Sequence, residues 1–239
     1  MKKFTGLILV ACFWLFVNNP ALLAQQYPFE KWDSLTLKKA NTAKDVSYMT
    51  EDEKKVIFYI NLARMNPKLF SETYLKQYLD AVQADSSVGR EELTYIISLQ
   101  SDLKPAKKMD ALLPLKELYE SANVHAKNMG ESGKTGHANY DKRFLKVTKN
   151  HNNYVTGENC DYGNAEPLAI VLDLLIDAGV SGCGHRKNIL NKYFVSIAAS
   201  IEPHKKYGWN CVIDFVGGQE STSEKKNWLR SWFGFLFKK

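Results

Sequence analysis

Two stretches of alternating apolar residues near the end of the chain constrain its fold most. They cover residues 195–201 and 209–215, and every second residue in each is apolar. A period of two is typical of strands that bury one face, and the loop over residues 203–208 predicts that the two strands pair as an antiparallel hairpin. Other elements must cover the apolar face of this hairpin.

Three strong amphipathic helices are predicted before the hairpin, together with a helix around residues 69–83 and a short helical segment over residues 185–190. The first begins at a capping box formed by Thr50 and Glu53. The second starts at Pro114 and ends before Gly130, and the third covers residues 164–178 with apolar residues at helical spacing. Because helices come first and strands late, we expect an α+β fold with a small, mainly antiparallel sheet packed by helices.

Residues 1–24 have the pattern of an export signal. Lys2 and Lys3 precede an apolar run over residues 7–17, and small residues lead to a cleavage site after Ala24. The run is too short to span a bilayer. The alternative is a lipid anchor at Cys12, although apolar residues continue past this cysteine where a polar tether is expected. We therefore expect a secreted or periplasmic protein.

Charge and local motifs exclude several function classes. The net charge of +6 arises from 32 basic and 26 acidic residues that are spread along the chain, which disfavours a nucleic-acid binder. The close-spaced histidine and cysteine patterns of metal sites are absent, as is the G-x-S-x-G pattern of serine hydrolases.

The mature chain is predicted to consist of one domain with two extensions. Residues 25–49 lack apolar periodicity and are interpreted as an N-terminal arm, and residues 50–218 form the domain. The C-terminal tail, residues 219–239, combines large apolar side chains with basic residues. Either these side chains dock on the domain, or the tail contacts a membrane surface or a partner.

Short motifs along residues 50–218 resemble those of the CAP superfamily, which includes cysteine-rich secretory proteins and plant pathogenesis-related proteins. They occur in the order seen in bacterial SCP-like extracellular domains. The resemblance implies a three-layer α/β/α sandwich. The motifs are Asn61-Leu62-Ala63-Arg64, Leu115 with Ala122 and His125, Thr135-Gly136-His137, Gly157-Glu158-Asn159, Gly184-His185-Arg186-Lys187-Asn188-Ile189-Leu190 and Cys211-Val212-Ile213-Asp214-Phe215.

The resemblance also implies a cleft that two histidines and two acids share. The match assigns His137 and His185 as metal ligands, with Glu158 beside them, and places Asn159 and Arg186 at the cleft. A glutamate expected before the second histidine is missing, so the fourth position falls to Asp173 or to Asp177, which is nearer His185. Because two protein ligands are fewer than the usual three, zinc binding should be weak and conditional on pH and supply.

Cysteine pairing is a further implication of the resemblance. Export leaves three cysteines, an odd number in an oxidising compartment. The converging motifs imply a disulfide between Cys160 and Cys183, which would remove Cys183 as a nucleophile and leave Cys211 as a buried thiol.

Three functions remain open at this stage. The first is a binding module for a small or amphipathic ligand, a lipid or a cell-wall component. The second is a metal-dependent hydrolase or peptidase with Glu158 as the general base. The third is a structural surface protein that acts through its C-terminal tail.

Overall fold

The computed structural model describes residues 28–84, 90–148 and 154–218. The predicted export signal, Cys12 and the C-terminal tail therefore lie outside the described residues. Within the described ranges, no helix has both the length and the apolar character needed to cross a membrane.

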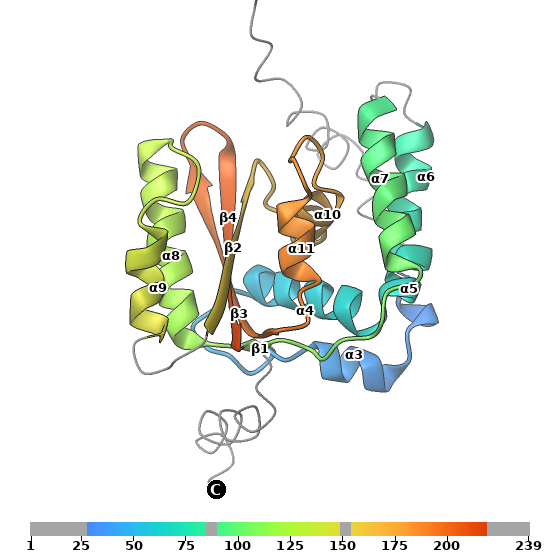
Figure 1. Ribbon diagram of the computed structural model, residues 1–239, viewed down its shortest axis with the longest axis horizontal. Helices are drawn as coiled ribbons and strands as arrows, with labels where there is room; N and C mark the ends of the chain where they lie inside the picture. The colour runs from blue at the N-terminus through green and yellow to red at the C-terminus, as the bar shows by residue number, and fades with distance from the viewer. Residues whose placement is uncertain (1–27, 85–89, 149–153, 219–239) are drawn as a thin grey trace, which may run out of the picture.

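The centre of the fold is a four-stranded sheet with the strand order β1-β3-β4-β2 (Figure 1). The predicted hairpin is present as β3 (Phe194–His204) and β4 (Gly208–Gly218), which are antiparallel. The edge strand β2 (Tyr154–Tyr162) is antiparallel to β4, and the short β1 (Leu113–Pro114) is parallel to β3. The sheet is thus mainly antiparallel, as predicted.

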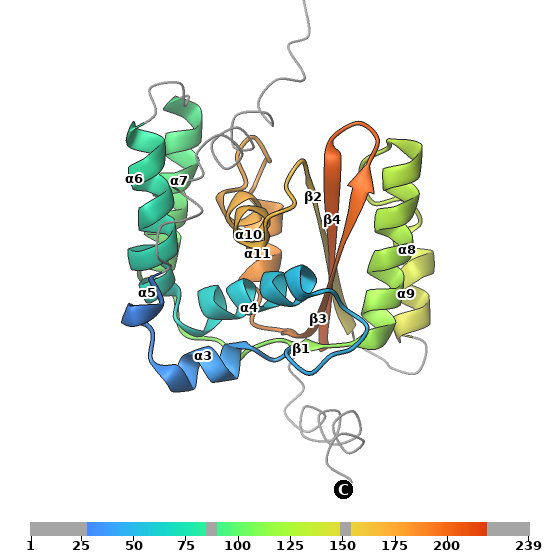
Figure 2. The same cartoon turned by 180° about the vertical axis from the view of Figure 1, so that it is seen from behind.

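Helices cover both faces of this sheet (Figures 1 and 2). On one face lie α8 (Lys116–Ser132) and α9 (Tyr140–Thr148). On the other lie α4 (Glu51–Met65), α10 (Pro167–Ile176) and α11 (Gly184–Ile189). The three-layer α/β/α sandwich expected from the sequence is therefore confirmed.

Residues 28–49 form part of the folded domain. They include the short helix η1 (Pro28–Lys31) and α3 (Ser34–Ala40), and the side chain of Trp32 is only 4% exposed. Trp32 Nε1 donates a hydrogen bond to Thr73 Oγ1 at 3.3 Å, and Asn61 Nδ2 donates to the Ala40 carbonyl at 3.0 Å. The segment interpreted as an arm thus packs on the domain core.

Four consecutive helical segments flank the α4 and α10 side of the fold (Figures 1 and 2). They are α5 (Pro67–Phe70), the π-helical η2 (Ser71–Leu75), α6 (Lys76–Ala84) and α7 (Arg90–Leu103). The aromatic ring of Tyr74 in η2 contacts the rings of Trp32, Tyr59 and Phe70. This cluster joins the N-terminal segment to α4 and α5.

Two buried charged residues of α4 fix the loops and strands around it. Glu53 completes the predicted capping box with Thr50, and its other carboxylate oxygen accepts a hydrogen bond from the backbone N–H of Ile201 in β3 at 3.0 Å. Arg64 donates to the carbonyls of Ile189 at 2.7 Å and Asn191 at 2.8 Å. Arg64 therefore holds the chain where it leaves α11 and enters β3.

Candidate functional site

Strand β2 directs neighbouring side chains to opposite faces of the sheet. Glu158 contacts residues of the α8 and α9 layer, and Asn159 contacts α11. Gly157 precedes them because a Cβ at this position would lie 2.7 Å from the Phe194 ring and 3.1 Å from Asn188 Oδ1. The Gly157-Glu158-Asn159 motif therefore combines close packing with two polar side chains that act on different layers.

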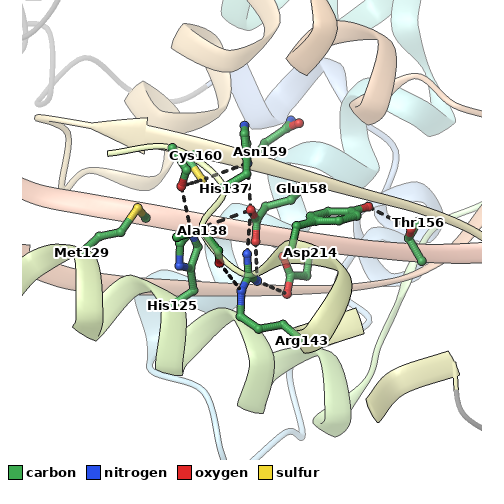
Figure 3. Close-up of polar contacts among 12 residues, drawn as sticks. His125, Met129, His137, Ala138, Arg143, Thr156, Glu158, Asn159, Cys160 and Asp214 are labelled. Atoms are coloured by element: carbon green, nitrogen blue, oxygen red, sulfur yellow. Dashed lines mark hydrogen bonds and ion pairs between the residues drawn. The ribbon is translucent and has the colours of Figure 1, made fainter. Parts of the chain in front are cut away.

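The buried Glu158 pairs with His137, a partly exposed residue of the loop between α8 and α9 (Figure 3). His137 Nδ1 and Glu158 Oε1 are 2.7 Å apart; the Glu158 side chain is 0% exposed, and that of His137 is 49% exposed. A carboxylate only accepts hydrogen bonds, so Nδ1 carries the proton, and in the neutral imidazole Nε2 has a free lone pair. Among the described residues, Nε2 of His137 has no hydrogen-bond partner.

Arg143 of α9 holds the same carboxylate from the other side (Figure 3). Its Nη2 donates to Glu158 Oε1 at 3.0 Å, its Nη1 lies 2.6 Å from Oε2, and its Nε donates to the Ala138 carbonyl at 3.1 Å. Hydrogen bonds between two ionised groups are among the stronger ones in proteins. Arg143 thus fixes both Glu158 and the loop that carries His137.

The protons of this cluster are divided unequally between two carboxyl groups. Asp214 of β4 is the strand partner of Glu158. Burial would raise the pKa of Glu158, but hydrogen bonds from His137 and Arg143 outweigh it and lower this pKa to about 2. Burial, together with the Glu158 charge, raises the pKa of Asp214 well above its usual range. Glu158 is therefore the ionised member and Asp214 the protonated one.

A second histidine–carboxylate pair lies at the start of α11. His185 Nδ1 and Asp177 Oδ1 are 2.7 Å apart, and Asp177 Oδ2 accepts the backbone N–H of His185 at 2.9 Å. Asp177 is the left-handed C-cap of α10, with φ of 58°, and this turn directs its side chain to α11. Nε2 of His185 likewise has no partner in the described part of the chain.

Asp173, the other acid considered for this position, belongs to a different contact. Burial raises its pKa, while a hydrogen bond from Asp161 of β2 lowers it. The pKa of Asp161 is raised well above its usual range by burial and by Asp173. The two acids thus share a proton, and Asp177 is the acid that pairs with His185.

Asn159 connects β2 to the second pair. Its Nδ2 donates to the backbone carbonyl of His185 at 3.1 Å, and its Oδ1 accepts from Asn188 Nδ2 at 2.8 Å. The residue next to Glu158 in the chain therefore positions the helix that carries His185. Among the described residues, no hydrogen bond joins His137 directly to His185.

Arg186, predicted to lie at the cleft, instead supports α11 from behind. Its side chain is buried, with Nε donating to the Leu175 carbonyl at 2.7 Å, Nη2 to the Ile176 carbonyl at 2.8 Å, and Nη1 to Asp102 Oδ2 at 2.8 Å. Neighbouring residues of an α-helix point about 100° apart, so His185 and Arg186 face different surroundings. Arg186 satisfies the last carbonyls of α10, which have no partner within that helix.

The predicted Cys160–Cys183 disulfide is not formed, because both cysteines, like Cys211, are free thiols. Cys160 faces the α8 and α9 layer, where its Sγ lies 3.8 Å from His137 Nδ1. Cys183 is the N-cap residue of α11, on the other face of the sheet. Each of these two cysteines is close to a cleft motif in the sequence, but the sequence did not show that they lie on opposite faces of the sheet. Cys211 is buried, as predicted.

His125, Glu158 and Cys160 form a buried group that could hold a metal ion, since one ligand atom of each lies within 4.8 Å of the others. The ring of His125, on α8, places Nε2 3.7 Å from Glu158 Oε1 and 2.8 Å from the Gly136 carbonyl. The sequence reasoning missed His125, Arg143 and Asp214 as neighbours of Glu158. One usable signal was Asp214, an acid in the middle of an apolar strand.

An α/β/α sandwich with two histidine–carboxylate pairs beside an edge strand defines the class of this protein. A family model described as the cysteine-rich secretory protein family, CAP, matches residues 59–215. The chain belongs to the CAP family.

Comparisons with other proteins gave distant similarities. The solved structure of an outer surface protein from Borrelia burgdorferi is 14% identical and has a TM-score of 0.37; the match covers 61% of this chain and 93% of that one. A cysteine-rich secretory protein from Staphylococcus aureus is 11% identical, with a TM-score of 0.36, and the match covers 55% of this chain and 40% of that one. The search of curated proteins gave no match.

Proposed function

We propose that this chain is an exported CAP domain that binds a divalent metal, zinc in the first place, through Nε2 of His137 and Nε2 of His185, which lie beside the edge strand β2 on opposite faces of the sheet. The bound metal would tune the affinity of the domain for a small or amphipathic ligand, such as a lipid or a cell-wall component. The single observation that carries the proposal is the geometry of the two imidazoles. Each is bonded through Nδ1 to a buried carboxylate at 2.7 Å.

This geometry is the one that metal-binding histidines commonly have. A carboxylate on one ring nitrogen fixes the tautomer and the ring orientation, and makes the other nitrogen a better ligand. Glu158 and Asp177 supply these carboxylates without taking up the Nε2 atoms. Two imidazoles leave coordination positions for water or a ligand, and they predict weaker binding than a complete set of protein ligands.

The buried His125 group is less suited to the same role. His125 Nε2 lies 2.8 Å from the Gly136 carbonyl, and a carbonyl only accepts, so this nitrogen carries a proton instead of a free lone pair. The Arg143 cation already neutralises the Glu158 carboxylate at 2.6 Å. A metal ion there would have to displace both contacts.

Binding is better supported than hydrolysis by the position of Glu158. A general base must come within about 2.6–3.2 Å of the proton that it removes, or reach it through one water molecule. The Glu158 side chain is 0% exposed, and both its oxygens face His137 or Arg143. These contacts favour an orienting role for Glu158, and they weaken the case for a hydrolase that uses it as a base.

Calorimetric titration of the metal-free mature chain with zinc tests the proposal. We expect micromolar or weaker binding, lost in His137→Ala and in His185→Ala. The control is Lys38→Ala, an exposed residue of α3, which should keep the zinc affinity of the wild type. Unchanged zinc affinity in both alanine variants, with melting temperatures near that of the wild type, would exclude these histidines as ligands.

A further inference from the structure

A second candidate binding region lies on the outer side of α8 and α9. A groove of about 1130 Å³ runs between the two helices and is bordered at one end by Lys134, Thr135, Ala138 and Asn139 and by Lys205 of the β3–β4 turn. Neither His137 nor His185 lines it. Small-molecule sites typically enclose roughly 300–1,000 Å³, so this groove has room for an extended ligand.

Four exposed lysines border the groove: Lys134, Lys142, Lys146 and Lys205. None of them forms an ion pair with the residues that the structure describes. They stand at both ends of the groove, with Lys142 and Lys146 on α9 and the other two near the end of α8. Their charges are thus available to an anionic ligand.

The other basic groups of the groove are already engaged. Arg143 contacts Glu158 through both terminal nitrogens, and His125 Nε2 is bonded to the Gly136 carbonyl. Electrostatic attraction to a ligand in this groove must therefore come from the four lysines. This separation allows the lysines to be changed without disturbing the pair formed by His137 and Glu158.

The rest of the lining selects against a uniform polyanion. Glu117, Glu120 and Glu131 also border the groove, and they would repel a nucleic acid or a phosphate polymer. Val124 of α8, which is 54% exposed, and Ala138 also line the groove. A lining that mixes lysines, apolar side chains and a few glutamates complements a peptide that carries both acidic and apolar residues.

We propose that the groove between α8 and α9 binds an acidic, partly apolar peptide segment of a partner protein. The C-terminal tail of this chain is a poor occupant, because residues 225–239 carry five basic residues of the same charge as the groove lysines. The proposed metal site takes no part in this interaction. The metal proposal and the peptide proposal can therefore be tested independently, and failure of one leaves the other unaffected.

The test uses a short fluorescent peptide of alternating glutamate and leucine, titrated with the full mature chain and followed by anisotropy. We expect binding that weakens as salt is added, because added ions screen exposed charges over a Debye length of about 10 Å at 0.1 M. The double variant Lys142→Glu/Lys146→Glu should bind at least about tenfold more weakly, since it replaces attraction by repulsion at two positions.

The matched control is Lys38→Glu/Lys39→Glu, which makes the same change of net charge on the exposed surface of α3. It should retain the affinity of the wild type. An equal loss in both double variants would mean that only net charge matters and would overturn the proposal. Tighter binding of polyphosphate than of the peptide would overturn the choice of ligand, and zinc titration of both double variants should give the wild-type affinity.

Discussion

Replacing Arg143 by methionine is expected to destabilise the metal-free domain by about 3 kcal/mol or more. The guanidinium lies 2.6 Å from Glu158 Oε2 and donates to Oε1 at 3.0 Å, and the carboxylate is 0% exposed. Methionine fills a similar volume but leaves Glu158 only its hydrogen bonds with His137 and the protonated Asp214. Removing one member of a buried ion pair typically costs about 3–5 kcal/mol, because the other charge stays buried without compensation.

Urea and thermal unfolding of the wild type and the variant measure this effect. For a domain of this size, about 3 kcal/mol corresponds to a fall in melting temperature of roughly 6–12 °C. Lys146→Met, an exposed lysine on the same helix, is the control and should change stability by less than about 0.5 kcal/mol. The double variant Arg143→Met/Glu158→Gln should lose less than the sum of the single variants, with a coupling of about 2 kcal/mol.

The destabilisation caused by Arg143→Met should become smaller as the pH falls. The contacts with His137 and Arg143 lower the pKa of Glu158 from 4.5 to about 2. The resulting stability is present above the unfolded pKa and is lost as pH falls through the folded pKa. The difference in the free energy of unfolding between the wild type and Arg143→Met should therefore decrease as the pH falls from about 4.5 to 2. A destabilisation of less than about 1 kcal/mol at pH 7 would refute the reasoning. So would a difference in the free energy of unfolding that grows as the pH falls.

Three further substitutions have defined outcomes. Arg64→Met should lower the free energy of unfolding in urea by about 3 kcal/mol, since the carbonyls of Ile189, Asn191 and Phe194 lose their donor. Gly157→Ala should lower the free energy of unfolding by about 1–3 kcal/mol, because the new methyl group would clash with the Phe194 ring. This ring stacks on Phe215 at 5.2 Å and has little freedom to move. A melting curve that matches the wild type would contradict this prediction. Asp177→Asn should weaken zinc binding by about 10–100-fold in calorimetry, with the fold retained.

Regular apolar periodicity made part of the fold predictable from the sequence. The β3–β4 hairpin and the helices α4, α8 and α10 follow it, and all were expected near their observed positions. Strand β2 was missed because the side chains that it turns to α8 and α9 include Thr156, Glu158 and Cys160, whose polarity serves the site. The N-terminal segment was missed because its buried residues have no regular spacing.

The site was only partly readable for a related reason. Short motifs indicated Glu158, His137 and His185, but the pairing of Asp177 with His185 depends on a left-handed residue at the end of α10. A single backbone conformation of this kind leaves no periodic signal in the sequence. The position of Arg186 behind α11, and the separation of Cys160 from Cys183, depend on which side of an element a side chain faces.

The alternation of β2 makes strand register a condition for the site. Glu158 is aligned with Asp214 of β4, and Asn159 with Ile213. A slip by one residue would turn the Glu158 carboxylate away from Arg143 and remove the amide that holds the His185 carbonyl, because side chains alternate strictly along a strand. His137 would then lose its carboxylate partner, and α11 would lose its amide contact with β2, in one event. Molecules with misaligned β2 should therefore be unable to form the His137–Glu158 pair, so metal affinity would indicate correct folding as well as the presence of the ligands.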